Sequence, residues 1–459
     1  MFQLKKFKNP KAGILGLGRS GRAVAQLLAQ KGVEVLISEE APIAHVDSLG
    51  LPPKVKVETG GHSSKLFECD FWVKSPGIFP KSPILLEGKR RNIPVFSELE
   101  VALSFLPKKT RVFAVTGTNG KTTTTSLLGE ILKADAALKK DRAVFVCGNI
   151  GNPVSHCVSE VHSGDDVVIE VSSYQLEDST YFRPKYACVL NITPDHLDHH
   201  NGMKNYCKAK AKIFKNQRAN DFLILNGADS ICVQFPPKIK STVLAFSTQP
   251  KHALKTDVFF DGDEIIFSEG YRIRPPHLKG IHNVENAMAA ALMALAAGVS
   301  AETIQHVFET FAPMEHRIEP FAYHKGVVYI NDSKATNLDS TITALKSFEK
   351  TPAVWLILGG RDKGASYEVL LPYLKTYCKR VLTIGEAMDK IERELGNYPV
   401  TRCTTLENAV QTAMQGAKKG DIVLLSPACS SFDQFKDYEQ RGKIFKQLVN
   451  ARIFNDRTK

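Results

Sequence analysis

Residues 115–123, VTGTNGKTT, contain the side chains whose chemistry is easiest to predict. A glycine turn directly after an apolar run leaves backbone N–H groups free to surround phosphate oxygens, and Lys121 can reach the β- and γ-phosphates of a nucleotide. A hydroxyl at Thr122 or Thr123 can contact Mg²⁺. The segment departs from the common GxxxxGK[ST] pattern, because Val115 occupies the place of the first glycine. We therefore expect ATP and Mg²⁺ to bind at Gly117, Thr118, Asn119, Gly120, Lys121, Thr122 and Thr123.

Possible metal ligands stand near the ends of two further apolar runs. Glu170 closes the run 167–169, and His196 lies in residues 191–198, NITPDHLD. A carboxylate suits Mg²⁺, whereas imidazole is an unusual ligand for so hard an ion. The same loop holds further candidate ligands, so a zinc hydrolase is an alternative interpretation, although the helical HExxH pattern is absent. These further residues are Asp195, Asp198, His199 and His200.

Lys210 belongs to a basic segment, residues 206–214, YCKAKAKIF. A basic segment of this kind is usually a solvated helix face, and the spacing alone favours that interpretation for Lys210. By itself, the segment gives Lys210 no chemical role.

Two glycine turns in the first hundred residues could approach a second anionic ligand. Residues 16–21, GLGRSG, follow an apolar run and open a helical pattern, so that backbone N–H groups can face a diphosphate. Residues 74–78, KSPGI, close another strand of the same region. Glu39 and Glu40 lie about twenty residues beyond the first turn, where an NAD-binding fold has an acidic residue. An NAD-dependent oxidoreductase is therefore an alternative, which NADH binding would test.

Three polar clusters near the end of the chain suggest a pocket for an anion. They are residues 331–337 (NDSKATN), 359–364 (GGRDKG) and 426–435 (SPACSSFDQF), and each begins where an apolar run ends. Their lysines and hydroxyls suit a substrate that bears carboxylates.

A folded scaffold must bring these polar segments together. Along the chain, apolar runs alternate with helical patterns. Such alternation predicts an α/β fold with mostly parallel sheets, whose carboxyl edges gather the polar segments. Asp261-Gly262 between two apolar runs predicts one antiparallel hairpin. Strands are expected at residues 12–15, 33–38, 55–58, 71–74, 93–96, 112–115, 143–147, 167–171, 187–191, 222–226, 258–260, 264–267, 327–330, 354–358, 380–384 and 422–425. We expect domain boundaries near residues 100 and 313.

Composition limits the protein class. The chain has 459 residues and a formal net charge of +12, and the excess of basic residues is spread over both ends rather than gathered in a stripe. That distribution argues against nucleic-acid binding and is compatible with a small polyanionic substrate. No apolar run reaches the roughly 20 residues that span a bilayer, and no signal-type segment is present. Nine widely spaced cysteines without CxxC indicate a reducing compartment, so we expect a cytoplasmic protein without a membrane partner.

Taken together, the motifs resemble those of the ATP-dependent Mur ligases of bacterial cell-wall synthesis. The resemblance covers the whole chain in order, and residues 426–442 resemble those of the members that add D-glutamate. The DNPR block of the members that add diaminopimelate or lysine is absent. The matching blocks are GLGRSG, SPGI, GTNGKTT, GNIGNP, EVSSYQLE, NITPDHLDHH, LKGIHNVENAMAA, HRIE, NDSKATN, GGRDKG and LLSPACSSFDQF.

The resemblance implies three α/β domains with separate ligands. Residues 1–100 would form a Rossmann-like domain for the UDP substrate, residues 101–313 a P-loop ATPase-like domain with a small antiparallel hairpin region, and residues 314–459 a Rossmann-like domain for the amino acid. The first glycine turn would then hold a uridine diphosphate rather than NAD. At the uracil position this chain has Ser38-Glu39-Glu40, where family members often have Asp-Thr/Ser-Arg.

The resemblance also implies roles for individual residues. The implied catalytic residues are Lys121, Glu170, His196 and Lys210, of which Lys210 would be a CO₂ adduct, a carbamoylated lysine. The implied metal ligands are Thr122, Glu170, His196 and Lys210. The implied nucleotide clamp adds Asn283, Asn286, Arg317, Asp332 and Lys334 to the ATP site. The implied UDP-substrate contacts are Gly18, Arg19, Ser20, Ser75, Gly77, Asn149, Ser173 and Gln175. The implied D-glutamate contacts are Thr336, Lys363, Ser431, Phe432 and Tyr438, the last of which is often Phe in the family.

The reaction that the resemblance implies joins D-glutamate to UDP-N-acetylmuramoyl-L-alanine with ATP, through an acyl phosphate and a tetrahedral intermediate. We expect a monomer whose partners are small molecules. Two alternatives stay open from sequence: another Mur or folylpolyglutamate-type amino-acid ligase, and a non-catalytic sensor that binds ATP and a nucleotide sugar. The final serine-rich block distinguishes the first. The presence of Lys121, Glu170, His196 and Lys210 argues against the second.

Overall fold

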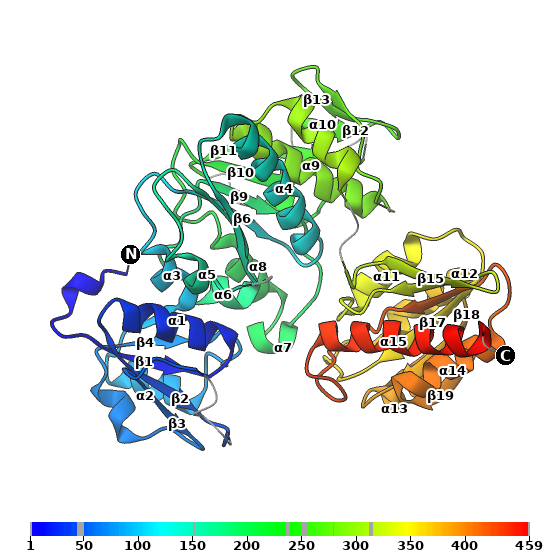
Figure 1. Cartoon of the computed structure of the whole chain (residues 1–459), viewed down its shortest axis with the longest axis horizontal. Helices are drawn as coiled ribbons and strands as arrows, with labels where there is room; N and C mark the ends of the chain where they lie inside the picture. The colour runs from blue at the N-terminus through cyan, green and yellow to red at the C-terminus, as the bar shows by residue number, and fades with distance from the viewer. Residues whose placement is uncertain are drawn as a thin grey trace. The chain divides into compact units, whose positions relative to one another are not determined.

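The computed structural model describes residues 2–43, 50–149, 152–235, 239–249, 256–278, 280–311 and 315–457. The chain forms two compact units, the first with Met1–Pro276 and Glu285–Thr310, the second with His277–Val284 and Phe311–Lys459. In Figure 1 the first unit runs mainly from blue to green and the second mainly from yellow to red. The boundary expected near residue 313 lies outside the described residues.

The first sheet is parallel and stands at the start of the first unit. Its order is β3-β2-β1-β4-β5, so β1 lies at the centre with β2 and β4 as neighbours. Ile14, Val35 and Val73 from these three strands are at most 1% exposed, because both faces of the sheet are covered. The strands are β1 (Lys11–Leu15), β2 (Glu34–Glu39), β3 (Val55–Thr59), β4 (Phe71–Lys74) and β5 (Val95–Ser97).

The second sheet also belongs to the first unit and has the order β14-β13-β12-β11-β10-β9-β6-β8-β7. Strands β7 to β12 pair in parallel, and β13 and β14 add an antiparallel edge. β6 lies between β8 and β9, so the segments after these three strands meet at one edge. The strands are β6 (Arg111–Thr116), β7 (Val144–Gly148), β8 (Asp166–Glu170), β9 (Tyr186–Val189), β10 (Phe222–Asn226), β11 (Thr242–Ser247), β12 (Val258–Phe260), β13 (Ile265–Phe267) and β14 (Arg272–Ile273).

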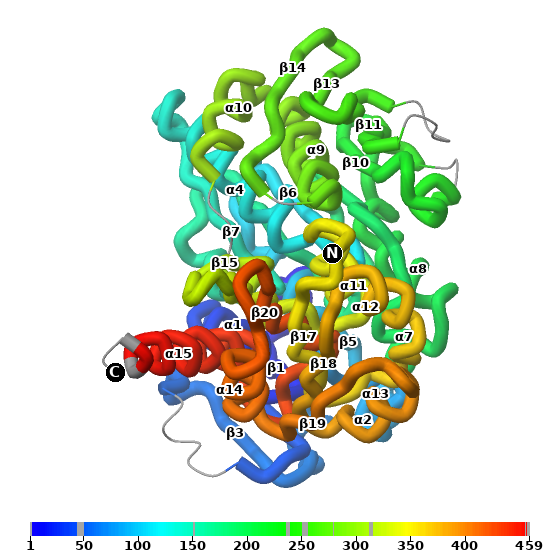
Figure 2. The backbone as a smooth tube through the Cα atoms, turned by 90° about the vertical axis from the view of Figure 1, so that its right-hand side faces the viewer, coloured from blue at the N-terminus to red at the C-terminus, as the bar shows by residue number. Residues whose placement is uncertain are grey.

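The third sheet is the core of the second unit and has the order β15-β16-β20-β17-β18-β19. β15 is antiparallel, and the other strands are parallel. Figure 2 shows β20, β17 and β18 lying side by side, as their pairing requires. The strands are β15 (Glu319–His324), β16 (Val327–Asn331), β17 (Val354–Gly359), β18 (Cys378–Ile384), β19 (Val400–Thr404) and β20 (Ile422–Leu425).

Helices cover the sheets, and their buried stripes complete each core. α1 follows β1 directly and buries Val24 and Leu28 against the first sheet. The helices of the first unit are α1 (Arg19–Gln30), α2 (Pro83–Arg90), α3 (Glu98–Leu103), α4 (Lys121–Lys139), α5 (Val154–Cys157), α6 (Ser173–Glu177), α7 (Leu197–His200), α8 (Met203–Ala211) and α10 (Ala301–Thr310). α9 (Ile281–Ala296) begins in the second unit and continues in the first. The helices of the second unit are α11 (Leu338–Lys346), α12 (Leu371–Tyr377), α13 (Met388–Leu395), α14 (Leu406–Gly416) and α15 (Tyr438–Arg457).

The predicted α/β fold is confirmed, and each predicted strand overlaps a strand of the structure. The hairpin predicted at Asp261-Gly262 is present, with Val258 opposite Phe267. Four strands, β11, β14, β15 and β19, were not predicted. β11 is exposed over its first residues, β14 has two residues, and β15 and β19 are edge strands with irregular register. Strands of this kind have weak apolar patterns, because only part of each is buried.

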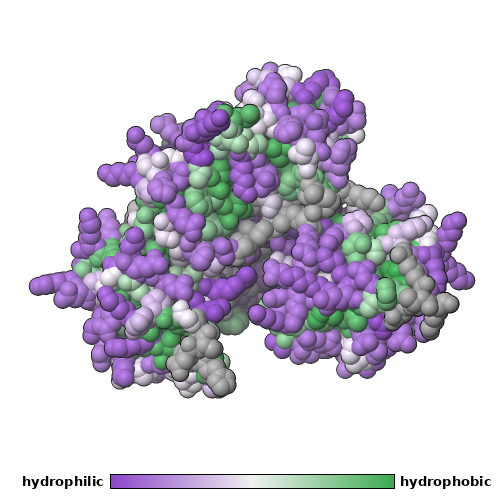
Figure 3. Space-filling model, viewed as in Figure 1, coloured by the Kyte–Doolittle hydropathy of each residue, from purple (hydrophilic) through white to green (hydrophobic). Residues whose placement is uncertain are grey.

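The surface in view is mainly hydrophilic on both units, with smaller hydrophobic areas between hydrophilic residues (Figure 3). Among the described residues, no helix combines the length and the apolar character needed to cross a bilayer. All nine cysteines are free, and eight of them are buried.

Candidate active site

The phosphate loop, residues 117–120, joins β6 to α4 at the centre of the second sheet. Gly120 caps α4 with φ +84°, in the left-handed region that favours glycine. A β-carbon on Gly120 would lie 2.1 Å from Oδ1 of Asn286, so a side chain does not fit there. The loop therefore presents its N–H groups at a helix N-terminus with no side chain at its last position.

The loop is fixed to the segment that follows β9. The N–H of Thr118 donates to the Asn191 carbonyl oxygen at 2.9 Å, and the N–H of Asn119 donates to Oδ1 of Asn191 at 2.8 Å. Oγ1 of Thr118 lies 3.0 Å from the hydroxyl of Tyr206 on α8. These bonds give the loop one conformation before any ligand binds, which reduces the entropy lost on binding.

Two lysines converge on one atom of the phosphate loop. Nζ of Lys121 donates to the Gly117 carbonyl oxygen at 2.9 Å, and Nζ of Lys210 donates to the same oxygen at 2.7 Å. Lys210 is 2% exposed, so the interpretation of this position as a solvated helix face is wrong. Burial, together with the charge of Lys121, holds the pKa of Lys210 well below its ordinary value. Lys210 is therefore driven toward a neutral amine.

Glu170 joins the phosphate loop to the strand beside it. Its Oε2 accepts a hydrogen bond from Oγ1 of Thr122 at 2.7 Å, and its Oε1 accepts one from Nδ2 of Asn149 at 2.8 Å. The residue is 1% exposed at the end of β8. Glu170 thus places a buried carboxylate beside the first turn of α4, which contains Thr122 and Thr123.

His196 lies in the loop before α7 and adopts φ +53°, which is uncommon for a residue with a side chain. Its Nε2 lies 3.4 Å from Oδ2 of Asp195, and its ring packs 4.9 Å from the ring of Tyr174. Tyr174 belongs to α6, four residues after Glu170. Backbone strain of this kind persists only where surrounding contacts impose it, and it is concentrated at functional sites.

The glycine turn after β1 contacts Glu39, the acidic residue that lies about twenty residues beyond it in the sequence. The N–H of Leu17 donates to Oε2 of Glu39 at 2.8 Å. Gly21 packs so closely on the turn that a β-carbon there would lie 2.1 Å from the Gly16 carbonyl oxygen. Ser75 donates to that same oxygen at 3.4 Å, which links the two glycine turns. The other candidate UDP contacts of this region, Gly18, Arg19, Ser20 and Gly77, lie at or near the surface around these turns.

Ser173 and Gln175 are both buried on α6, and Gln175 has its partner at the N-cap of this helix. Oε1 of Gln175 accepts from the N–H of Ser172 at 3.0 Å, and Oγ of Ser172 accepts from the N–H of Gln175 at 3.3 Å. This reciprocal pair is a capping box that fixes the start of α6. Oγ of Ser173 lies 2.9 Å from Nε2 of His200.

In the second unit, the three polar clusters follow three adjacent strands, β16, β20 and β17. Parallel strands end at the same edge, so the order of the sheet brings the clusters together. Arg361 and Ser430 from two of these clusters bond through their backbones at 2.9 and 3.2 Å. The expected meeting of polar segments at one sheet edge is therefore present here.

Asp332 is the most buried charged candidate of the second unit. Its Oδ2 accepts from Oγ of Ser426 at 2.8 Å, and its Oδ1 accepts from the N–H of Ile318 at 3.2 Å. Burial raises the pKa of Asp332 to about 7, against the hydrogen bond from Ser426 and the charge of Arg317. Nζ of Lys334 lies 5.4 Å from the ring centroid of Tyr438, a cation–π distance.

The D-glutamate candidates lie in the same loops but differ in exposure. Ser431 is 2% exposed and Phe432 is 62% exposed, although they are neighbours. Thr336, Lys363 and Tyr438 are partly buried.

Arg441, a fully buried guanidinium on α15, is not among the residues predicted for the site. It donates to the Ser333 carbonyl oxygen at 2.8 Å and to the Cys429 carbonyl oxygen at 3.2 Å, and so joins two of the three clusters. Its signal in the sequence was its place in residues 426–442, the block that resembles the members that add D-glutamate, but nothing there distinguishes it from a surface arginine.

Comparisons with known proteins match all three sheets. The model of the MurD N-terminal domain matches residues 11–84, that of the Mur ligase middle domain matches residues 115–294, and that of the Mur ligase glutamate ligase domain matches residues 316–429. The chain belongs to the Mur ligase family. It is therefore an ATP-dependent, ADP-forming amide ligase.

Curated relatives match this Mur ligase from end to end. The UDP-N-acetylmuramoylalanine–D-glutamate ligase of Elusimicrobium minutum is 53% identical over 453 residues, covering 98% of this chain and 100% of that one. The ligase of the same name from Koribacter versatilis is 46% identical, covering 95% and 96%. These shares leave no large region of the chain without a counterpart.

Solved Mur ligases share the fold at low sequence identity. The UDP-N-acetylmuramate–alanine ligase MurC of Thermotoga maritima aligns with a TM-score of 0.63 at 19% identity, covering 96% of this chain and 100% of that one. The MurF ligase of Thermotoga maritima in complex with ADP aligns with a TM-score of 0.60 at 14% identity, covering 98% and 97%. These likenesses support the fold.

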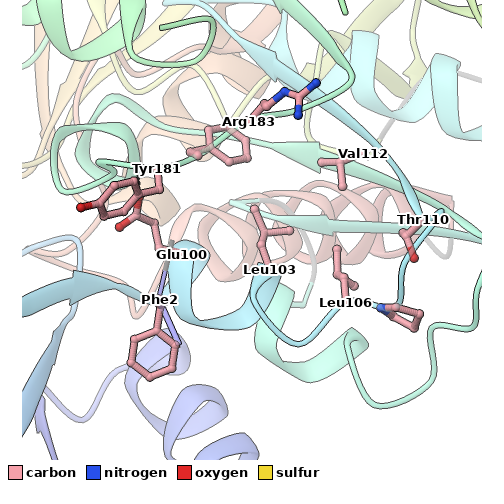
Figure 4. A pocket seen from close by; sticks show the side chains of 10 residues that line it. Phe2, Glu100, Leu103, Leu106, Thr110, Val112, Tyr181 and Arg183 are labelled. Carbon is pink, nitrogen blue, oxygen red and sulfur yellow. Dashed lines mark hydrogen bonds between the residues drawn. The ribbon is translucent and has the colours of Figure 1, made fainter. Parts of the chain in front are cut away.

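This Mur ligase also has a pocket away from the phosphate loop. The pocket has a volume of about 190 Å³ and lies among α3, the segment before β6 and residues 181–183. Figure 4 shows Leu103, Leu106 and Val112 along its apolar wall, with Glu100 and Tyr181 at one end. None of the candidate ATP, metal or substrate residues lines it.

Proposed function

We propose that the chain joins D-glutamate to UDP-N-acetylmuramoyl-L-alanine, at the expense of ATP, in the synthesis of a peptidoglycan precursor. The observation on which this rests is the convergence of Lys121 and Lys210 on the phosphate loop, next to the Thr122–Glu170 pair at the start of α4. The curated relatives of this chain have the corresponding ligase name at up to 53% identity.

The residues around the phosphate loop fit MgATP. Oγ1 of Thr123 is a buried hydroxyl with no hydrogen-bond partner among the described residues, which suits a phosphate oxygen. Thr122 and Glu170 offer the hard oxygen donors that Mg²⁺ prefers. When bound, Mg²⁺ neutralises charge on the phosphates. We assign to the ATP site residues 117–123 with Asn283, Asn286, Arg317, Asp332 and Lys334.

Lys210 fits a metal site only in an altered form, because an ammonium does not ligate a cation. We infer that its amine attacks CO₂, loses a proton and becomes a carbamate. The reaction requires a neutral amine, which burial and Lys121 favour. The negative carbamate would also be attracted to the ammonium of Lys121. Glu170, His196 and the carbamate of Lys210 complete the proposed metal ligands with Thr122.

The first chemical step activates a poor electrophile. A carboxylate oxygen of the L-alanyl group attacks the γ-phosphorus of ATP, the bond to the bridging oxygen breaks, and ADP leaves with that oxygen. Lys121 holds the γ-phosphate oxygens and offsets their growing charge, which is the main contribution that a protein makes to such a transfer. The product is an acyl phosphate.

The second step forms the amide bond. The neutral amine of D-glutamate attacks the acyl carbon, loses a proton, and the tetrahedral intermediate expels phosphate as the carbonyl re-forms. We assign the carboxylates of D-glutamate to Thr336, Lys363, Ser431, Phe432 and Tyr438 in the second unit. Lys363 and the hydroxyls match the negative charge of a dicarboxylate.

We further assign the substrates by segment. The UDP sugar binds in residues 1–100, at Gly18, Arg19, Ser20, Ser75 and Gly77, with Asn149, Ser173 and Gln175 nearer the reacting carboxylate. The main ATP-binding segment is residues 101–313, and the amino acid binds in residues 314–459. Because Glu39 already accepts from Leu17, we expect the uracil to contact backbone groups at Ser38-Glu39-Glu40.

A phosphate-release assay tests the proposal. Enzyme, ATP, Mg²⁺ and UDP-N-acetylmuramoyl-L-alanine are mixed with D-glutamate, L-glutamate, D-aspartate, L-lysine or meso-diaminopimelate in turn. Release that depends on D-glutamate supports the proposal, and the Glu170→Gln variant is the inactive control. Release with another amino acid but not with D-glutamate would assign the chain to a different branch, and no release with any would favour a binding protein.

A further inference from the structure

Residues Glu177, His199 and His200 form a cluster that the proposed ligase reaction does not use. Glu177 is the last residue of α6, and the two histidines are the last residues of α7, all within the first unit. Their candidate ligand atoms all lie within 4.8 Å of one another. The two histidines belong to the loop whose composition left a zinc site open in the sequence.

The geometry of the cluster is close to that of a three-ligand metal centre. Nε2 of His199 lies 2.7 Å from Oε2 of Glu177, and Nδ1 of His200 lies 3.5 Å from Oε1 of the same carboxylate. Zinc bonds of about 2.0–2.2 Å at tetrahedral angles put neighbouring ligand atoms roughly 3.3 Å apart. The His200 distance has that size and the His199 distance is about half an ångström shorter, but the two distances end on different oxygens. A carboxylate that binds through one oxygen must therefore rotate to bring that oxygen within reach of an ion held by both histidines.

His200 supplies an independent sign of a missing ligand. Its side chain is fully buried, and its Nδ1 has no hydrogen-bond partner in the part of the chain that the structure describes. Nε2 of the same ring lies 2.9 Å from Oγ of Ser173. When Nε2 donates its proton to this hydroxyl, Nδ1 keeps a lone pair directed at the cluster. Metal-binding histidines are held in this way, with the second ring nitrogen donating to a neighbouring acceptor.

We propose that Glu177, His199 and His200 bind one divalent cation of the zinc class, with water in the fourth position. Two imidazoles and one carboxylate suit Zn²⁺ and similar transition-metal ions such as Co²⁺, whereas Mg²⁺ prefers oxygen ligands alone. The ion would join the end of α6 to the end of α7 and so brace the loop that contains His196. Its ligands differ from those assigned to the nucleotide-bound metal.

The surroundings permit an ion to enter from one side. The side chains of His199 and His200 are 5% and 0% exposed, whereas that of Glu177 is 23% exposed, so the carboxylate faces the entrance. The ring centroid of Tyr174 lies 4.3 Å from that of His199 and 4.9 Å from that of His196. Tyr174 therefore packs between the proposed ligand His199 and the loop residue His196. The nearby Lys212 ammonium donates to the Glu177 main-chain carbonyl, which leaves both oxygens of the carboxylate to the histidines.

The test is a titration of the full-length protein with Zn²⁺, followed by calorimetry, and with Co²⁺, followed by visible absorption. We expect one Zn²⁺ per chain in the presence of excess Mg²⁺ and ATP, and the intense bands of four-coordinate Co²⁺. His199→Gln and Glu177→Gln should each weaken Zn²⁺ binding at least tenfold, since even an outer-shell change costs about 10–100-fold in metal affinity. His162→Gln is the matched control, because that imidazole side chain is 86% exposed.

The outcomes separate the proposal from simple hydrogen bonding of Glu177 to two histidines. Thermal unfolding without metal shows whether each variant is folded, and Zn²⁺ should raise the midpoint of the unsubstituted chain and of His162→Gln but not of His199→Gln. Equal Zn²⁺ affinity in His199→Gln and the unsubstituted chain would overturn the proposal. Absence of binding in the unsubstituted chain would also overturn it.

Discussion

Replacement of Lys210 is the perturbation that bears most directly on the metal and nucleotide site. The amine is buried and donates to the Gly117 carbonyl oxygen at 2.7 Å, beside Lys121. If Lys210 acts as a carbamate, its removal deletes one anionic ligand from a site that handles phosphates. We expect Lys210→Ala to lower kcat by about a thousandfold or more, which corresponds to roughly 4 kcal/mol of transition-state free energy.

The effect on the free energy of unfolding should be smaller and can be estimated separately. Lys210→Met keeps the stem and loses one hydrogen bond, so about 1 kcal/mol is expected. Lys210→Ala also removes three buried methylene groups at about 0.8 kcal/mol each, which brings the loss to roughly 3 kcal/mol. Domains usually have about 5–15 kcal/mol of stability, so both variants should remain folded and any loss of activity is chemical.

The assay is phosphate release at saturating substrates, with and without short carboxylic acids such as formate or acetate. Added acid should restore part of the activity of Lys210→Ala, because it fills the space of the carbamate, and should not help Lys210→Met, whose stem occupies that space. Lys208→Ala, an exposed lysine on the same helix, is the matched control and should retain activity. Near-normal kcat in Lys210→Ala without added acid would refute the reasoning.

Three further predictions concern the phosphate loop and the second unit. Lys121→Ala should abolish ADP formation, because the charge on the γ-phosphate is no longer offset, and turnover within tenfold of normal would remove Lys121 from the site. Gly120→Ala should lower the free energy of unfolding by about 1–3 kcal/mol from the left-handed backbone alone, and by more from the contact at 2.1 Å with Asn286. Gly164→Ala, with φ +102° and no atom within 4 Å, has the same backbone strain without the contact, so equal losses in the two variants in urea unfolding would contradict the prediction. Because burial raises the pKa of Asp332 to about 7, the folded state retains a proton that the unfolded state loses above its ordinary pKa of 3.8. Stability should therefore fall by up to about 1.4 kcal/mol per pH unit from pH 4 to pH 7, and Asp332→Asn should remove that slope in urea unfolding at several pH values.

Much of the scaffold follows from local pattern. Buried parallel strands such as β4 and β10 are continuous apolar runs, and their observed bounds equal the predicted ones. β15 was missed because it is an antiparallel edge strand with Pro320 at its second residue and a break in register. Its strand conformation depends on β16, which lies next to it only after folding.

In the candidate site, too, some residues can be predicted from local sequence and others cannot. The phosphate loop could be predicted because its glycines, Lys121 and the threonines that follow form a short pattern whose function is visible in the sequence alone. Spacing on a helix puts Lys208 and Lys210 of α8 on different sides, but only tertiary packing decides that the side with Lys210 is buried and that Lys208 is exposed. Arg441 likewise bonds to Ser333, 108 residues earlier in the chain, and to Cys429, 12 residues earlier. No local sequence pattern encodes these bonds.

The central claim is that ATP activates the L-alanyl carboxylate of the UDP sugar for attack by D-glutamate. The most direct measurement uses UDP-N-acetylmuramoyl-L-alanine with ¹⁸O in that carboxylate, followed by mass spectrometry of both products. We predict that each turnover transfers one ¹⁸O to the released phosphate and adds one glutamyl residue to the nucleotide sugar. Released phosphate without ¹⁸O, or a nucleotide sugar of unchanged mass, would contradict the account.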